Sequence, residues 1–185
     1  MLESAEDNQK WGRYTFLGYD PRLEITCTNG KLTIKNGTSV NMETKHPGEY
    51  IRQILDENKS PKIEGFPTFT GGLVGYFSYD YMKYAEPSLV LDAEDKEGFK
   101  DVDMMLFDKV IAFDHFRQKI ILIVNIRCED LKTEYHRAEL ELSTMKQLIQ
   151  SGEMAEEIPG RCTSEFRALF DQKQYCSMVE KAKHY

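Results

Sequence analysis

The sequence predicts an α+β fold, an antiparallel β-rich sheet with packed helices. Three observations predict it. Apolar and polar residues alternate in several short segments, turn-forming dipeptides separate those segments, and longer segments repeat their apolar residues every three or four positions. Alternation is typical of half-buried strands, and the longer repeat is typical of amphipathic helices. Antiparallel pairing is expected because short turns can join antiparallel strands but not parallel ones.

A β-hairpin near the N-terminus is the clearest local feature. Apolar and polar residues alternate over 23–27, and Asn29-Gly30 follows. This dipeptide tolerates the two positive φ angles of a type I′ turn, so the second strand of the hairpin is expected to run through 32–34. Flanking strands are expected at 13–18, before Asp20-Pro21, and through Val40 and Met42, after Asn36-Gly37.

Three segments are expected to be helical. Pro47 suits the first turn of a helix over 47–58, where its missing N–H costs nothing. Apolar residues recur at helical spacing over 131–151, and Gly152 is placed to end that helix. Asp171 and Gln174 have the spacing of a capping box for a last helix. Its buried side is expected to comprise Tyr175, Met178, Val179 and Ala182.

A second hairpin is predicted within 104–127. Five consecutive apolar residues at 120–124 indicate a central strand covered on both faces. The charged stretch 91–103 is expected to be a surface loop. Several carboxylates at the ends of this hairpin lack the spacing of a calcium loop and are expected in solvated turns. They are Asp101, Asp103, Asp108 and Asp114.

Composition excludes several classes of function. With 24 basic and 31 acidic residues the net charge is −7, so the chain offers no basic face for nucleic acid. No apolar run reaches the roughly 20 residues that span a bilayer, and no signal peptide is recognisable, which favours a cytoplasmic protein without a membrane partner. Cysteines and histidines are too scattered for a metal site or a nucleophile system. We therefore expect no catalytic residue, metal or cofactor in a single domain, 1–185.

Three segments carry a family resemblance: Leu-Glu-Ser-Ala-Glu at 2–6, Lys-Trp-Gly-Arg-Tyr-Thr-Phe-Leu-Gly at 10–18 with Asp20-Pro21, and the glycine-rich stretch 67–80. They resemble the N-terminal region of anthranilate synthase component I, and 175–183 is a weaker fourth match. Their order and spacing agree along essentially the whole chain. The last helix also ends without a stop signal, which is typical of a fragment.

The resemblance implies the N-terminal part of the anthranilate synthase component I fold, packed against a C-terminal chorismate-binding domain absent from this chain. In the family, that domain holds the chorismate pocket, the Mg²⁺ ligands and the acid and base residues. The complete enzyme converts chorismate and ammonia to anthranilate and pyruvate in tryptophan biosynthesis. A glutamine amidotransferase subunit, component II, delivers the ammonia. This chain alone is expected to be inactive.

The resemblance also implies part of a feedback site for tryptophan. Glu3 and Ser4 match the family's tryptophan-binding element: a carboxylate can pair with the ammonium of an amino acid, and a hydroxyl or N–H can orient its polar end. Arg13 aligns with a basic position near that site in some relatives, and Pro67 is expected to line the pocket. The alternatives are a solvated acidic terminus for Glu3 and an exposed strand position for Arg13.

Two further readings of the whole chain remain open. It is either a purely structural domain without effector binding, or the N-terminal part of aminodeoxychorismate synthase component I, which shares the fold. The glycines at 71–75 lack the Lys-Ser/Thr of a phosphate loop, and strand glycines more often allow close backbone approach. The aromatic residues within 76–84 are expected to pack in the core or at a domain interface.

Overall fold

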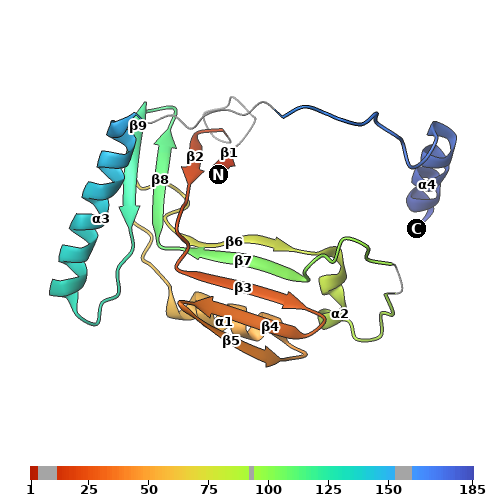
Figure 1. Ribbon diagram of the computed structural model, residues 1–185, viewed down its shortest axis with the longest axis horizontal. Coiled ribbons are helices and arrows are strands. Elements are labelled where there is room, and N and C mark those ends of the chain that lie inside the picture. Colours follow the sequence, from red (N-terminus) through yellow and green to blue (C-terminus); the bar gives the residue numbers. More distant parts are fainter. Residues whose placement is uncertain (4–11, 92–93, 153–159) are drawn as a thin grey trace. The chain divides into compact units, whose positions relative to one another are not determined.

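The computed structural model describes residues 1–3, 12–91, 94–152 and 160–185 (Figure 1). The chain divides into two compact units, Met1–Ser151 and Gly152–Tyr185. Among the described residues, the first unit contains two antiparallel sheets, three α-helices and one short 3-10 helix, and the second contains one α-helix. The predicted α+β class is confirmed. No helix in the described part of the chain is long and apolar enough to cross a membrane.

The larger sheet has the strand order β5-β4-β3-β7-β6. Its strands are β3 (Leu23–Thr28), β4 (Lys31–Asn36), β5 (Thr38–Glu43), β6 (Gly72–Phe77) and β7 (Val102–Phe107). The predicted hairpin is confirmed, with Asn29 and Gly30 at φ 49° and 81°, as a type I′ turn requires. Helix α1 (Pro47–Glu57) buries Ile51 and Ile54 against this sheet.

The smaller sheet has the order β1-β2-β8-β9. It comprises β1 (Leu2–Glu3), β2 (Tyr14–Leu17), β8 (Lys109–Asp114) and β9 (Lys119–Val124). The second predicted hairpin therefore consists of β8 and β9, while β7 belongs to the other sheet. Residues 120–124 also form an outer strand of the described sheet, and Ile120 is 48% exposed, so the predicted central position is wrong. The inner strands of this sheet are β2 and β8, and Val110, Ile111 and Ala112 of β8 are buried.

Asp108 alone separates β7 from β8, so the chain changes sheets within one residue. Asn125 fastens this point. Its backbone N–H donates to Asp108 O at 2.8 Å, and its side-chain Nδ2 donates to Thr70 O at 2.7 Å and to Asp108 O at 3.2 Å. Asn125, the residue directly after β9, thereby links the segment before β6 to the point where the chain passes from β7 to β8.

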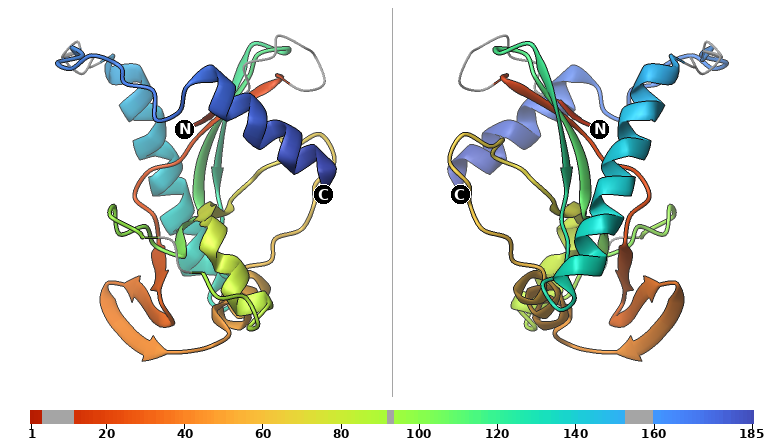
Figure 2. Two further views of the ribbon diagram at one scale, coloured as in Figure 1. Left: turned by 90° about the vertical axis from the view of Figure 1, so that its right-hand side faces the viewer. Right: turned by 90° about the vertical axis from the view of Figure 1, so that its left-hand side faces the viewer.

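Helix α3 (Leu131–Ser151) lies along the smaller sheet beside β9 (Figure 2). Both of its ends agree with the sequence prediction, and Gly152 has φ 63°, the left-handed conformation of a helix stop. Ala138 and Met145 are buried, whereas Tyr135 near the start is 59% exposed. Only the later part of the amphipathic stripe therefore faces the core. After β6 of the larger sheet, the chain forms the short helices η1 (Tyr79–Tyr81) and α2 (Met82–Ala85).

The second unit contains α4 (Gln172–His184) and its predicted capping box. Asp171 Oδ1 accepts from Gln174 N at 2.7 Å, and Gln174 Oε1 accepts from Asp171 N at 3.0 Å. The predicted buried side is not buried within this unit, because Tyr175, Met178 and Val179 are exposed by 62%, 43% and 41%. The connector predicted at 153–163 lies partly outside the described residues.

Asp114, predicted in a solvated turn, is only 2% exposed, so that prediction is wrong. Its carboxylate accepts from Arg13 Nε at 3.0 Å and from Arg13 Nη2 at 2.7 Å. These hydrogen bonds hold the pKa of Asp114 down to about 2, against burial, which would raise it; the Arg117 N–H adds a further bond at 3.0 Å. A planar guanidinium matches two carboxylate oxygens at once, which suits a desolvated pair.

We predict that Gly75→Ala destabilises the first unit by about 3 kcal/mol. The added Cβ would clash with backbone atoms of the neighbouring strand, and backbone atoms cannot move aside as a flexible side chain can. A Cβ at Gly75 would overlap the carbonyl oxygen of Asp103 and lie 2.6 Å from Met104 Cα. Urea unfolding followed by circular dichroism measures the loss. Gly160→Ala is the control, because its Cβ would meet nothing within 4 Å. Equal stability of the two variants would contradict the prediction.

We predict that Asp114→Asn costs about 3 kcal/mol at pH 7, because it breaks a buried ion pair. The pKa of Asp114 is lowered on folding to about 2. The ionised form therefore stabilises the fold fully above about pH 4, and this contribution disappears as the pH falls through about 2. Unfolding free energies of wild type and variant should converge between these values. Asp56→Asn, at an exposed pair with Lys59, is the control and should show no such convergence.

Candidate functional site

Glu3, the first predicted tryptophan ligand, lies on the outer strand β1 directly opposite Thr15 of β2. Thr15 Oγ1 donates to Glu3 Oε1 at 3.3 Å and lies 2.7 Å from Nε2 of His115, just after β8. Thr15 is 6% exposed, whereas Glu3 is exposed. The carboxylate is therefore available to a ligand while its neighbour is fixed in the sheet. Ser4, the second predicted ligand, lies outside the described residues.

Arg13 is neither a free cation nor a simple exposed strand residue. Its guanidinium forms the two hydrogen bonds to Asp114 and lies over two aromatic rings, 4.8 Å from the centroid of Tyr14 and 5.6 Å from that of Phe116. The paired carboxylate raises the pKa of Arg13 above its ordinary value. This geometry commits most of the guanidinium to holding β2 on β8.

The two faces of the smaller sheet separate the predicted ligands. Side chains alternate along a strand, and residues opposite each other in an antiparallel pair share a face. Tyr14 pairs with Asp114 and Glu3 pairs with Thr15, so the Arg13–Asp114 pair and the Glu3 carboxylate lie on opposite faces. The sequence could not reveal this separation, since it depends on which strand lies beside β2.

Pro67, predicted to line the tryptophan pocket, is buried. Its neighbour Phe69 packs edge-on against Phe16, with ring centroids 5.6 Å apart. Phe16 shares its face with Tyr14, and the two rings stack at 5.7 Å. The segment that contains Pro67 thus reaches the smaller sheet on the same face as the Arg13 guanidinium, opposite Glu3.

The glycine-rich segment packs closely, as predicted. Gly71 has φ 142°, and a Cβ there would lie 2.6 Å from Asn125 Nδ2 and 2.9 Å from Phe107 O. Only glycine fits between the crossing point of the sheets and Asn125. The following residues form strand β6 rather than the start of an amphipathic helix, which agrees with rejecting a phosphate loop.

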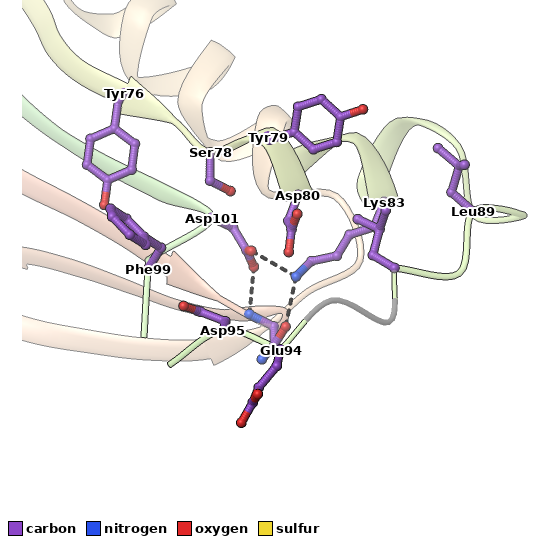
Figure 3. Close-up of a pocket in the computed structure, with 12 residues that line it drawn as sticks. Tyr76, Ser78, Tyr79, Asp80, Lys83, Leu89, Glu94, Asp95, Phe99 and Asp101 are labelled. Atoms are coloured by element: carbon purple, nitrogen blue, oxygen red, sulfur yellow. Dashed lines mark hydrogen bonds and ion pairs between the residues drawn. The ribbon is translucent and has the colours of Figure 1, made fainter. Parts of the chain in front are cut away.

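A cavity of about 730 Å³ lies between the end of β6, the segment that contains η1 and α2, residues from the stretch 89–101, and Asn29 in the β3–β4 turn (Figure 3). Asp101 is at its base and is 3% exposed, so the predicted solvated turn is wrong here too. Its carboxylate accepts from Asn29 N at 2.6 Å, from Tyr84 OH at 2.6 Å and from Lys83 Nζ at 2.8 Å. Burial alone would raise the pKa of Asp101, but these donors outweigh it and the pKa lies below its ordinary value.

This cluster closes on itself. Lys83 Nζ also donates to Asn29 Oδ1 at 2.8 Å, and Tyr84 OH accepts from Gly30 N at 2.7 Å. Burial and the bond to Asp101 raise the pKa of Tyr84, so this phenol stays a donor. The cluster fastens α2 to the turn of the β3–β4 hairpin. In the described part of the chain no three His, Cys, Asp or Glu side chains come together as metal ligands.

Comparisons with known proteins show which family this chain belongs to. The profile of the family described as chorismate binding enzyme matches residues 2–185. Anthranilate synthase component 1 of Acinetobacter calcoaceticus is 34% identical over 191 residues, which cover 100% of this chain and 38% of that protein. Aminodeoxychorismate synthase component 1 of Bacillus subtilis is 30% identical over 192 residues, again 100% and 38%.

A solved structure shows the same fold. The crystal structure of anthranilate synthase component I from Streptococcus pneumoniae TIGR4 matches with a TM-score of 0.67 at 24% identity, covering 100% of this chain and 39% of that one. This chain thus spans about two fifths of the length of the proteins it matches. The resemblance seen in the sequence is confirmed, and the chain belongs to the chorismate-binding enzyme family.

Proposed function

We propose that this chain is the N-terminal regulatory and scaffolding part of an anthranilate synthase component I. The complete enzyme, a lyase, would convert chorismate and ammonia to anthranilate and pyruvate in tryptophan biosynthesis. The observation that carries the proposal is the 34% identity to an anthranilate synthase component 1 across the whole chain, within a family match over 2–185. Catalytic residues would belong to the part of the relatives that this chain does not cover.

The proposed partners follow from the same relatives. These relatives are component 1 of an anthranilate synthase, which implies a component 2, here a glutamine amidotransferase subunit that supplies ammonia. Chorismate would bind in the portion beyond the present match. Mg²⁺ is proposed as a cofactor of the complete enzyme, with ligands beyond the present match, and a cytoplasmic location is proposed with it.

We further propose that Glu3 and Ser4 contribute to a feedback site for tryptophan. An exposed carboxylate held on a strand supports this role, because it can pair with the ammonium of an amino acid. Arg13 and Pro67 would act from the other face: Arg13 keeps β2 in place through Asp114, and Pro67 belongs to the segment whose Phe69 packs on Phe16 of β2. The competing proposal is a purely structural domain that binds no effector.

The sister activity is a second candidate, because the Bacillus subtilis relative is an aminodeoxychorismate synthase component 1. We predict that the complete protein, given chorismate and ammonia, releases anthranilate and an equal amount of pyruvate. Chromatography with mass detection identifies the product, and a lactate dehydrogenase assay measures pyruvate. Aminodeoxychorismate as the main product would assign the chain to the sister enzyme.

We predict that Glu3→Gln raises the tryptophan concentration for half-inhibition of the complete enzyme by about tenfold to a hundredfold, since it removes a charge-assisted hydrogen bond worth about 1.5–3 kcal/mol. Glutamine keeps the length of the side chain, so β1 should remain paired with β2. The measurement is anthranilate formation at increasing tryptophan.

The matched control is Glu24→Gln, which removes an exposed carboxylate of the larger sheet that pairs with Lys35 at 3.3 Å. This variant should be inhibited like the wild type. If tryptophan inhibits the Glu3 variant as strongly as the control, Glu3 is not a ligand. If tryptophan neither inhibits nor binds the wild type, the structural-domain proposal holds instead.

A further inference from the structure

We infer that Thr15 and His115 are positioning residues for the Glu3 carboxylate, and that this three-residue chain sets a preference for ligands that carry an α-ammonium group. The inference rests on the proposed feedback site and extends it to two residues that the sequence did not single out. Its basis is a continuous set of contacts from His115 Nε2 to Thr15 Oγ1 at 2.7 Å and on to Glu3 Oε1 at 3.3 Å.

The proton of the Thr15 hydroxyl decides the direction of this chain. An ionised carboxylate only accepts hydrogen bonds, so the single hydroxyl proton has to point to Glu3. The hydroxyl oxygen must then accept from His115, which requires a proton on Nε2. If the proton were on Nδ1 alone, the hydroxyl would turn toward Nε2 and leave Glu3 without its donor. With its proton on Nε2, His115 holds the Thr15 hydroxyl in the orientation that supports the carboxylate.

Thr15 is well suited to fix another side chain. It is 6% exposed and lies in β2, between β1 and β8. A β-branched side chain in a strand has few rotamers, so its hydroxyl occupies a defined place. The backbone N–H of His115, the residue after Asp114, donates to Arg13 O at 2.9 Å. The backbone of Arg13 thus bonds to His115 while its side chain pairs with Asp114. The ion pair on one face and the hydrogen-bond chain on the other therefore secure the same two strands.

Positioning has a consequence for ligand selectivity. A free glutamate side chain loses rotamer entropy when it orders around a ligand, and prior ordering reduces that cost. The reduction benefits only ligands that use the carboxylate. Tryptophan carries an ammonium that can pair with Glu3, whereas indole-3-propionate has the same ring and carboxylate but no ammonium.

The test compares these two ligands on the complete enzyme by isothermal titration calorimetry. Thr15→Val keeps the shape and strand preference of the residue but removes the hydroxyl. We expect it to weaken tryptophan binding about fivefold to tenfold, the value of one hydrogen bond, and to leave the affinity for indole-3-propionate unchanged. Thr15→Ser restores the hydroxyl and should restore the preference. His115→Gln offers an amide N–H near Nε2 and should bind tryptophan more tightly than His115→Phe.

Thr33→Val is the matched control. It removes a strand hydroxyl that donates to Asn41 Oδ1 at 2.8 Å in the larger sheet, and it should leave both affinities unchanged. Equal weakening of both ligands by Thr15→Val would show a structural role only, and unchanged tryptophan binding would show no role. Either result overturns the inference while the feedback site stands. A wild-type enzyme that binds no tryptophan overturns the feedback site as well.

Discussion

A carboxylate removed from water has to be paired, and Asp114 at the end of β8 is almost completely removed from water. Arg13 supplies both hydrogen bonds of that pair from the start of β2, 101 positions earlier in the sequence. The position of β2 in the smaller sheet therefore depends on this contact. Because β1 pairs only with β2 among the described strands, the placement of Glu3 depends on it too.

The smaller sheet gives different tasks to its two faces. One face carries the Arg13–Asp114 pair and the stacked rings of Tyr14 and Phe16, which are packing and charge-pairing elements. The other face presents the Glu3 carboxylate beside Thr15. A substitution that weakens the ion pair would therefore disturb the proposed tryptophan site without removing a proposed contact with the ligand. Loss of inhibition in an Arg13 variant would thus be poor evidence that Arg13 is a ligand.

The larger sheet is organised around a second buried carboxylate. Asp101 gathers donors from the hairpin turn at Asn29 and from Lys83 and Tyr84 of α2. The polar groups of this cluster hydrogen-bond to one another and join α2 to the hairpin turn. We therefore interpret the neighbouring cavity as part of a structural contact rather than as a reaction centre.

The sequence by itself determined the features that arise from neighbouring residues. Asn29-Gly30 defines its turn because both residues adopt positive φ, and Asp171 with Gln174 forms its capping box within one helical turn. Helix α3 was predicted to the residue because its amphipathic repeat and its glycine stop are both local. The family was also recognisable from the sequence, because several short motifs together resemble it, and the family match confirms the resemblance.

Tertiary structure alone decided which strands meet. The sequence predicted β7 as part of the second hairpin, but the single residue Asp108 takes the chain into another sheet. It placed 120–124 at the centre of a sheet, although apolar runs occur on outer strands when a helix such as α3 covers them. Asp101 and Asp114 were wrongly expected in solvated turns, because the side-chain donors that allow their burial, Lys83 and Arg13, are distant in sequence. Strand pairing also put Glu3 and the Arg13 guanidinium on opposite faces of the smaller sheet. Local sequence patterns do not reveal this, because the register between strands distant in sequence depends on the tertiary structure.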